Sequence, residues 1–325
     1  MNGEWLVSDG LVRLRASVPE DVPALIVGRD AVFHRWLGAG SAAPAPTACI
    51  VVAGDLAGWI DYETGQDWLQ DGEVNVGYNV FPGHRGRGYA VRALQMLMHH
   101  LALRTQVHTA TLLIHPQNER SLAVAARARF VDHGEINGSR YFKRDVLPPS
   151  YSDGQLTIRA QHPDDLDMDL AAKDAEQMRW LWLPEHRAHW GSLTIAARRA
   201  HALRGLQANH AAFGLGPKWT FAGDYLDIRA AAYVDCDLAN DKVPAGDANI
   251  SYSVHPGYRG KGLAQRAVRL VLQFLRDHTA ARAAHIIVDT QNLPSLRVAR
   301  AFAPPSQIWR DRDDSMLVRH VIAVR

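Results

Sequence analysis

The spacing of hydrophobic residues predicts the same series of strands and helices twice along the chain. In the first half, apolar runs and alternating patterns predict strands at residues 11–15, 47–52, 56–62, 74–81 and 109–114. Apolar residues three or four apart predict amphipathic helices at residues 90–103 and 119–129. Another helix is expected to begin near residues 19–21, where a proline and two acids suit a first turn. This mixture predicts an α/β fold built on a mixed (α+β) sheet.

Several sequence segments of the first half recur in the same order in the second half. The segment 14–16, Leu-Arg-Ala, recurs as Ile-Arg-Ala at 158–160, an offset of 144 residues (14 to 158). The segment 80–90 recurs at 254–264, an offset of 174 (80 to 254). The second copy therefore carries 30 extra residues (174 minus 144), including an alanine- and leucine-rich stretch at 193–211 that predicts an added helix. We expect two tandem domains.

The prolines and small polar residues at positions 147–154 predict a linker between the two copies. This places the predicted domains at residues 1–150 and 151–325. Where the second domain has its added helix, the first has only a glycine-, alanine- and proline-rich stretch at 38–46. We therefore expect the N-terminal domain to have a shortened acceptor region.

Composition favours a small-molecule or peptide partner. Hydrophobic residues make up 47% of the 325 positions and charged residues 22%, a balance that excludes disorder and a disulfide scaffold. The net charge of +2 is too small to recruit nucleic acid or an anionic membrane. The two cysteines, Cys49 and Cys236, lie in different halves, and no targeting or membrane-spanning segment is recognised. The protein is expected to be cytoplasmic, as a monomer or homodimer.

Each predicted domain contains a short glycine-rich loop between its central strand and its long amphipathic helix. The first loop comprises Arg85, Gly86, Arg87, Gly88, Tyr89 and Ala90, and the second Arg259, Gly260, Lys261, Gly262, Leu263 and Ala264. A helix N-terminus offers unpaired amide hydrogens and partial positive charge, and glycine lets a ligand approach the backbone. Both loops are therefore predicted to hold a phosphate group. Their spacing matches neither a nucleoside-triphosphate loop nor a dinucleotide fingerprint.

The two loops resemble the coenzyme A loop of the GNAT superfamily of N-acetyltransferases, Arg/Gln-x-x-Gly-x-Gly/Ala. A second signature of that family, Asn-x-x-Ser-x-x-Val-Ala, begins at Asn118 and again at Asn292. This form is similar to the branch of ribosomal-protein N-terminal and small-amine acetyltransferases. The resemblance covers nearly all of both halves and implies two tandem GNAT-like acyl-CoA N-acyltransferase domains.

The resemblance also implies acetyl-CoA as the cosubstrate, spread between two diverging strands, and the primary amine of a small molecule or peptide as the acceptor. The pantetheine arm is then expected to contact the backbone at the end of the central strand, at Asn79, Val80, Ser253 and Val254. Asn118 and Asn292 are expected to cap their helices and to reach the same arm.

The catalytic groups are less well defined by the sequence. Many family members have a tyrosine that acts as the general acid at the positions where this chain has Ala125 and Ala299. In the branch that the chain resembles, a serine three residues after the asparagine is a candidate acid, and this implies Ser121 or Ser295. The glutamate that many relatives carry on the central strand is replaced by asparagine. The general base stays open among residues of this strand and the one before it: Asp61, Glu63, Tyr78, Asp235, Asp237 and Tyr252.

Two functions remain open at this point. The first is an N-acetyltransferase that works by direct attack of the amine, with the C-terminal domain expected to be catalytic because its added segment can build an acceptor pocket. The alternative is a non-catalytic acyl-CoA sensor or a partner-binding pseudoenzyme. No metal is expected, since His186 and His189 lack the His-Glu-x-x-His pattern or a cysteine companion.

Overall fold

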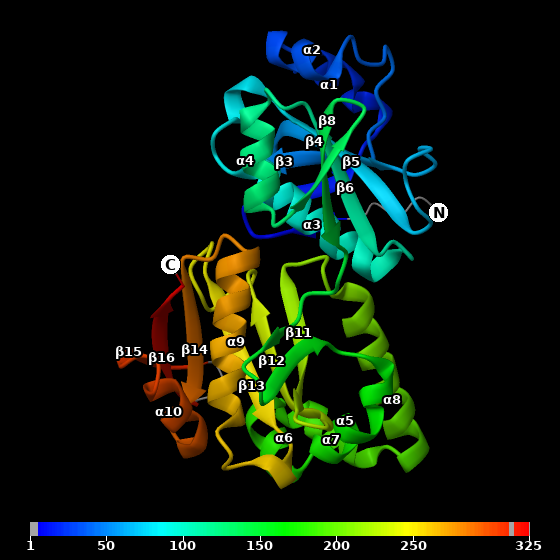
Figure 1. The fold of residues 1–325 in the computed structure, drawn as a ribbon. Coiled ribbons are helices and arrows are strands. Elements are labelled where there is room, and N and C mark those ends of the chain that lie inside the picture. The colour runs from blue at the N-terminus through cyan, green and yellow to red at the C-terminus, as the bar shows by residue number, and fades with distance from the viewer. Residues whose placement is uncertain (1–5, 312–314, 325) are drawn as a thin grey trace. The chain divides into compact units, whose positions relative to one another are not determined.

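The chain folds into two compact units whose boundary lies between Pro148 and Pro149. The computed structural model describes residues 6–311 and 315–324. Each unit contains one eight-stranded mixed sheet with helices packed against it (Figure 1). The expectation of an α/β fold in two similar copies is therefore confirmed.

In the first unit the strands lie in the order β1-β2-β3-β4-β5-β6-β8-β7. Their bounds are β1 Leu6–Ser8, β2 Val12–Ala16, β3 Ala48–Val52, β4 Asp55–Glu63, β5 Glu73–Val80, β6 Thr109–Ile114, β7 Val131–Ile136 and β8 Ser139–Asp145. The helices are α1 Val22–Val27, α2 Ala31–Leu37, α3 Tyr89–Arg104 and α4 Glu119–Arg127. Only β5 and β6 pair in parallel, because α3 crosses over between them.

In the second unit the order is β15-β16-β14-β13-β12-β11-β10-β9, which repeats the first arrangement. The strand bounds are β9 Tyr151–Ser152, β10 Leu156–Ala160, β11 Lys218–Tyr225, β12 Ile228–Asp237, β13 Ala248–Val254, β14 Ala283–Asp289, β15 Pro305–Arg310 and β16 Met316–Ala323. The helices are α5 Leu166–Ala172, α6 Ala175–Leu181, α7 Pro184–Ser192, α8 Ile195–Ala212, α9 Leu263–His278 and α10 Leu293–Arg300. The parallel pair is here β13 with β14.

Helices cover the second sheet on opposite faces. Phe274 of α9 packs on Trp219 and Phe221 of β11, with ring centroids 4.9 and 5.0 Å apart, and all three side chains are fully buried. Ala172 of α5 packs on Tyr233 of β12, whose side chain points to the other face. Burial of such aromatic side chains is the main source of stability in a core of this kind.

The extra residues of the second copy form α7 and α8, which pack on α5 rather than extending the sheet. Trp190 of α7 and Leu206 of α8 are buried against Leu166 of α5. The sequence predicted α8 from its many alanine and leucine residues but missed α7, Pro184–Ser192, which lacks that composition. It also missed β1, which has only three residues.

The same three ion pairs brace both units at equivalent positions. They are Arg15–Asp21, Asp9–Arg92 and Asp30–Arg85 in the first unit, and Arg159–Asp165, Asp153–Arg266 and Asp174–Arg259 in the second. The acids of the first of these pairs, Asp21 and Asp165, are almost fully buried. Hydrogen bonds from Arg15 lower the pKa of Asp21 to about 2.

Replacement of Asp21 by asparagine tests the energetic value of the first pair. Since the folded-state pKa lies below the ordinary value of 3.8, ionised Asp21 stabilises the fold above about pH 4, and this contribution is lost as the pH falls toward 2. We expect Asp21→Asn to lower the free energy of unfolding by roughly 1–3 kcal/mol near neutral pH. The difference from the parent should shrink between pH 4 and pH 2 in denaturant titrations. Asp55→Asn, at an exposed turn, is the control, and an equal loss there would contradict the assignment.

Candidate acyl-coenzyme A and acceptor site

The central strand of each unit parts from its parallel neighbour soon after the two begin. β5 pairs with β6 only from Glu73 to Asn75, although β5 continues to Val80. β13 pairs with β14 only at Ala248 and Asn249 and continues to Val254. Backbone groups along residues 76–80 and 250–254 therefore have no strand ladder on that side in the described part of the chain. Such an edge offers hydrogen bonds to an extended ligand with amide groups.

A glycine-rich turn follows each diverging strand and leads into the N-terminus of α3 or α9. Gly86 and Gly88 have φ values of 77° and 80°, and Gly260 and Gly262 have values of 78° and 76°. A side chain at any of these positions would meet no atom within 4 Å, so glycine is required for the left-handed backbone and the space beside it is open. The backbone amides of residues 86–91 and 260–265 find no acceptor among the described residues. These two groups of amides can bind an anion.

The arginine that begins each turn binds an aspartate and the last carbonyl of the preceding strand through its side chain. The Arg85 guanidinium donates to both carboxylate oxygens of Asp30, at 2.6 and 2.9 Å, and its Nε donates to the Val80 carbonyl at 2.7 Å. Arg259 makes the same bonds to Asp174, at 2.7 and 2.8 Å, and to the Val254 carbonyl at 3.2 Å. We therefore assign these arginines to holding the loop through their side chains.

Asp30 and Asp174 were missed by the sequence reasoning, which placed the arginines at the ligand. Each aspartate also caps a helix, since Asp30 accepts from the Phe33 amide at 2.9 Å and Asp174 from the Gln177 amide at 2.8 Å. The paired arginines hold the pKa of both carboxyls well below the usual range. The available signal was the recurrence of an aspartate directly before a helix at the offset of 144 residues.

The second basic residue of each loop differs in its surroundings. Arg87 is exposed on the first loop. The Lys261 ammonium lies over the rings of Tyr225 and Tyr258, 5.7 and 5.1 Å from their centroids. Both cations lie within the turn that carries the free amides, so each adds positive charge there.

The second signature forms a helix cap next to the diverging strands. Asn118 accepts from the Ser121 amide and Asn292 from the Ser295 amide, both at 3.2 Å. The Tyr252 hydroxyl donates to the Ser295 carbonyl at 3.1 Å, so β13 and α10 are in contact at this point. The capping bond uses one lone pair of each asparagine oxygen, and each side-chain amide nitrogen stays available to donate to a ligand.

Tyr78 and Tyr252 occupy equivalent positions under the first turns of α4 and α10. Burial raises the pKa of each to about 12, so both hydroxyls stay protonated near neutral pH. The Ser121 hydroxyl opposes this shift in part for Tyr78, although the two form no hydrogen bond of good geometry. Protonated phenols are unsuited to accept a proton, which argues against either tyrosine as the general base.

The carboxylates named as candidate bases have different partners. Asp61 accepts from the Thr47 amide at 3.0 Å and from the Thr47 hydroxyl at 2.5 Å. Glu63 accepts from Asn75 at 3.1 Å and is exposed, and Asp237 accepts from a turn amide at 2.9 Å. Asp235 lies 3.2 Å from the Lys218 ammonium, and burial raises the pKa of its carboxyl. Of these four groups, Asp235 is therefore the one that pairs with a cation among the described residues.

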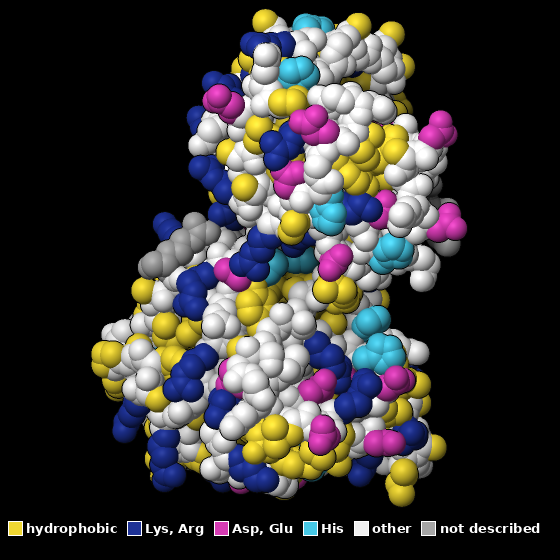
Figure 2. All heavy atoms as spheres, in the orientation of Figure 1, with side chains coloured by type: hydrophobic (Ala, Val, Ile, Leu, Met, Phe, Trp, Pro, Cys, Tyr) yellow, Lys and Arg dark blue, Asp and Glu magenta, His cyan; other side chains and the backbone are white. Residues whose placement is uncertain are grey.

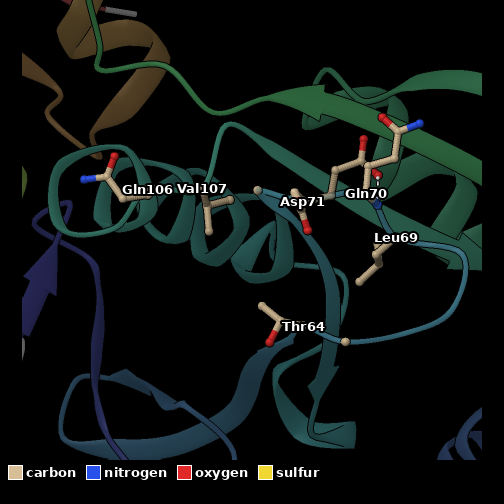
Figure 3. A pocket seen from close by; sticks show the side chains of 9 residues that line it. Thr64, Leu69, Gln70, Asp71, Gln106 and Val107 are labelled. Atoms are coloured by element: carbon tan, nitrogen blue, oxygen red, sulfur yellow. Dashed lines mark hydrogen bonds between the residues drawn. The ribbon is translucent and has the colours of Figure 1, made fainter.

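One hollow in the first unit, of about 280 Å³, lies away from these features. Thr64, Gln70, Asp71 and Val107 line it, where β5 begins and α3 has ended (Figure 3). The glycine-rich turn lies at the other end of both elements. The hollow is thus separate from the predicted site.

The described residues show no other kind of binding site in their surface charge, their possible metal ligands or their helix hydrophobicity. Basic and acidic side chains are interspersed over the face shown in Figure 2. Within residues 6–311 and 315–324, no three His, Cys, Asp or Glu side chains gather as a metal site. No helix in those same ranges is long and apolar enough to cross a membrane. Both cysteines are buried, and burial raises the pKa of each thiol.

Comparison with protein families gives the same result twice along the chain. The family model described as "Acetyltransferase (GNAT) domain" matches residues 12–131 and 155–302. The chain belongs to the GNAT acetyltransferase family. Both matched regions contain a diverging strand pair, a glycine-rich turn and an Asn-x-x-Ser helix cap, so the family assignment covers both units of this GNAT protein.

A search of curated proteins found no match. Solved structures show similarity over about half of the chain. A GNAT acetyltransferase from Bacillus anthracis is 15% identical, with a TM-score of 0.44, over 54% of this chain and 99% of its own. Mycobacterium smegmatis RimJ in complex with CoA-disulfide is 22% identical, with a TM-score of 0.35, over 44% and 86%. A chimeric spermidine N-acetyltransferase from Vibrio cholerae and a human counterpart is 12% identical, with a TM-score of 0.41, over 53% and 96%.

The aspartate brace can be tested by hydrogen exchange. Asp174→Ala removes both carboxylate bonds to Arg259, so the loop should open locally without global unfolding. We expect amide exchange in a peptide spanning residues 255–266 to be at least about tenfold faster, as loss of charge-assisted hydrogen bonds implies. Asp167→Ala, in an exposed pair with Arg199, is the control. Unchanged exchange in the Asp174 variant would show that the pair does not hold the loop.

Proposed function

We propose that this GNAT protein is an acetyl-CoA-dependent N-acetyltransferase that transfers acetyl to a primary amine of a small molecule or peptide by direct attack. The observation that carries the proposal is the pair of left-handed glycine turns with unpaired amides, each at the end of a strand that has left its parallel neighbour. A diphosphate and an amide-rich arm of one ligand fit these two features together.

The proposed cosubstrate contacts follow from this geometry. The amides of residues 86–91 and 260–265 bind the pyrophosphate, with Arg87 and Lys261 adding charge. The backbone at residues 79–80 and 253–254 binds the pantetheine arm, and the amide groups of Asn118 and Asn292 approach the same arm.

The proposed chemistry requires three groups. A backbone N–H near the end of the central strand polarises the thioester carbonyl as negative charge develops on its oxygen. The amine nitrogen attacks the carbonyl carbon, and the C–S bond breaks. The departing thiol resembles cysteine, with a pKa near 8.5, so its protonation needs only modest assistance. We assign this proton to the hydroxyl of Ser295 in the C-terminal domain, and to Ser121 in its counterpart.

The C-terminal domain is proposed as the catalytic one. In the N-terminal domain the Trp59 ring lies 3.8 Å from the position of a Cβ at Gly77 on β5. Trp36 of α2 packs on His115, which directly follows β6, with ring centroids 5.2 Å apart. The Trp59 ring thus takes up room on the face where the second sheet has Tyr233, whereas Trp36 recurs as Trp180 and does not distinguish the two domains. The second domain has α7 and α8 in this region instead of the short segment at 38–46.

The Trp59 ring on this face also supports a second role for the N-terminal domain. With its glycine turn intact and part of this face occupied, this domain is suited to binding acyl-CoA without turnover. A sensor function for the whole chain predicts binding without thiol release in both halves.

Calorimetry with acetyl-CoA tests the binding sites separately. We expect two sites for each chain, of which Gly88→Glu removes the first and Gly262→Glu the second, because a carboxylate enters the space reserved for the pyrophosphate. Gly138→Glu and Gly154→Glu are matched controls, since both glycines also have positive φ and open space around them. No binding by the folded parent protein would refute the proposal.

Turnover distinguishes the enzyme from the sensor. The parent protein is incubated with acetyl-CoA and spermidine, paromomycin or a peptide with a free N-terminus, while thiol release and acetylated product are measured. We expect turnover that Gly262→Glu abolishes and Gly88→Glu leaves largely intact. Binding without thiol release for every amine would favour the sensor.

A further inference from the structure

A polar cluster lies on the face of the second sheet that α5 and α6 cover. Tyr233 and Asp235 of β12 are directly opposite Ser253 and Ser251 of β13 in the antiparallel pair. Residues opposite each other in such a pair point to the same face of the sheet. Gln177 of α6 reaches this face, because its side-chain nitrogen donates to the Ser253 hydroxyl at 3.3 Å.

Several polar atoms of this cluster have no hydrogen-bond partner among the described residues. They are the side-chain oxygens of Gln177 and Asn249 and, further along the face near Asp165 and Asp169, the Tyr233 hydroxyl. Tyr233 is only 9% exposed. Burial of unpaired polar groups is unfavourable, and native proteins retain them mainly where water, an ion or a ligand completes the bonds. The cluster therefore has the character of an incomplete binding site.

The N-terminal domain shows what the same positions contain without such a site. Trp59 stands where the second domain has Tyr233, and Gly77 where it has Ser251. Trp59 packs with Leu25, Cys49 and Phe81 in an apolar cluster. Asn249 and Ser253 have polar counterparts in Asn75 and Asn79, which also have unpaired side-chain atoms, so the two domains differ on this face at Tyr233 and Ser251.

Asp235 lies on the same face directly opposite Ser251, whose hydroxyl accepts from the Asn249 amide nitrogen at 3.3 Å. Its counterpart Asp61 is bound by the amide and hydroxyl of Thr47, whereas Asp235 faces the Lys218 ammonium at 3.2 Å. The Asp235 side chain is 21% exposed and that of Lys218 is 54% exposed, so this pair is readily displaced. The lysine ammonium marks a position where a cationic amine can bind beside the carboxylate.

We propose that Asp235 is the catalytic base that takes a proton from the acceptor ammonium, and that Gln177 and Asn249 orient the amine. This inference rests on the proposed acetyltransferase function. Burial and the neighbouring Asp237 raise the pKa of Asp235, while Lys218 opposes this shift. A carboxylate whose pKa is raised above its ordinary value is a stronger base for this task.

The proposed step balances as follows. Ionised Asp235 accepts one proton from R–NH3⁺ and leaves a neutral amine. The nitrogen lone pair forms the C–N bond and the C–S bond breaks. Ser295 gives its hydroxyl proton to the coenzyme A sulfur and regains the second proton of the nitrogen. Asp235 then returns its proton to solvent, so the products are the amide, free thiol and one released proton.

The experiment compares Asp235→Asn with the parent protein. Three amines are first tried with the parent, namely spermidine, paromomycin and a peptide with a free N-terminus, and the one acetylated fastest is used for the comparison. Since a general base contributes on the order of 10²–10⁴ in rate, we expect kcat/KM near neutral pH to fall at least about 10²-fold while acetyl-CoA affinity is unchanged. The defect should shrink at high pH and with hydroxylamine, whose nitrogen is already unprotonated at neutral pH. Asp235→Glu should recover part of the activity.

Asp61→Asn is the matched control, because it removes the equivalent carboxylate from the domain that carries Trp59, and it should leave kcat/KM within about twofold. If the parent acetylates an amine and Asp235→Asn does so equally well, the assignment of the base is wrong and the enzyme function stands. The same holds if the loss is identical with hydroxylamine, since a purely structural defect would not depend on acceptor protonation. If the parent acetylates none of these amines, the proposed function fails and the assignment with it.

Discussion

The bidentate bond between a loop arginine and a helix-capping aspartate determines the geometry of each half of this protein. Arg85 and Asp30 join the glycine turn to α2, and Arg259 and Asp174 do the same with α6. In both halves the arginine also bonds the last carbonyl of the central strand. One side chain thus fixes the end of a strand, the turn after it and a helix from elsewhere in the sequence. The free amides can point outward because the arginine holds the loop from its inner side.

Around this shared frame the two halves have diverged in one respect above all. The frame residues recur in both units, as do the glycines and the asparagine caps. The face that α1 covers in the first unit and α5 in the second differs at two positions, because Trp59 and Gly77 stand where the second unit has Tyr233 and Ser251. Ligand binding through backbone amides depends on conformation and tolerates such change, whereas acceptor chemistry depends on particular side chains.

Much of the fold was predictable because it depends on local patterns. The period of apolar residues located the long helices, and the repeated segments revealed the duplication and the added helix. The glycine turns were found because left-handed backbone strongly favours one residue type. Short elements such as β1 and α7 were missed.

The parts of the site that sequence reasoning missed depend on pairings between distant residues. Asp30 meets an arginine 55 positions later, and spacing alone does not reveal this. The sequence left six side chains open as the general base. Choosing among them required knowledge of the hydrogen-bond and charged partners of each one. Thr47 beside Asp61 and Lys218 beside Asp235 are differences that only the folded sheet displays.

The indole of Trp59 has a consequence for any thioester carried by the N-terminal domain. Its ring covers the sheet at Gly77, beside the strand along which the acyl arm would lie. Nucleophiles, water included, would have to displace a packed aromatic side chain to reach a carbonyl behind it. Under the proposed function, this ring would slow the discharge of an acyl group bound in the N-terminal domain.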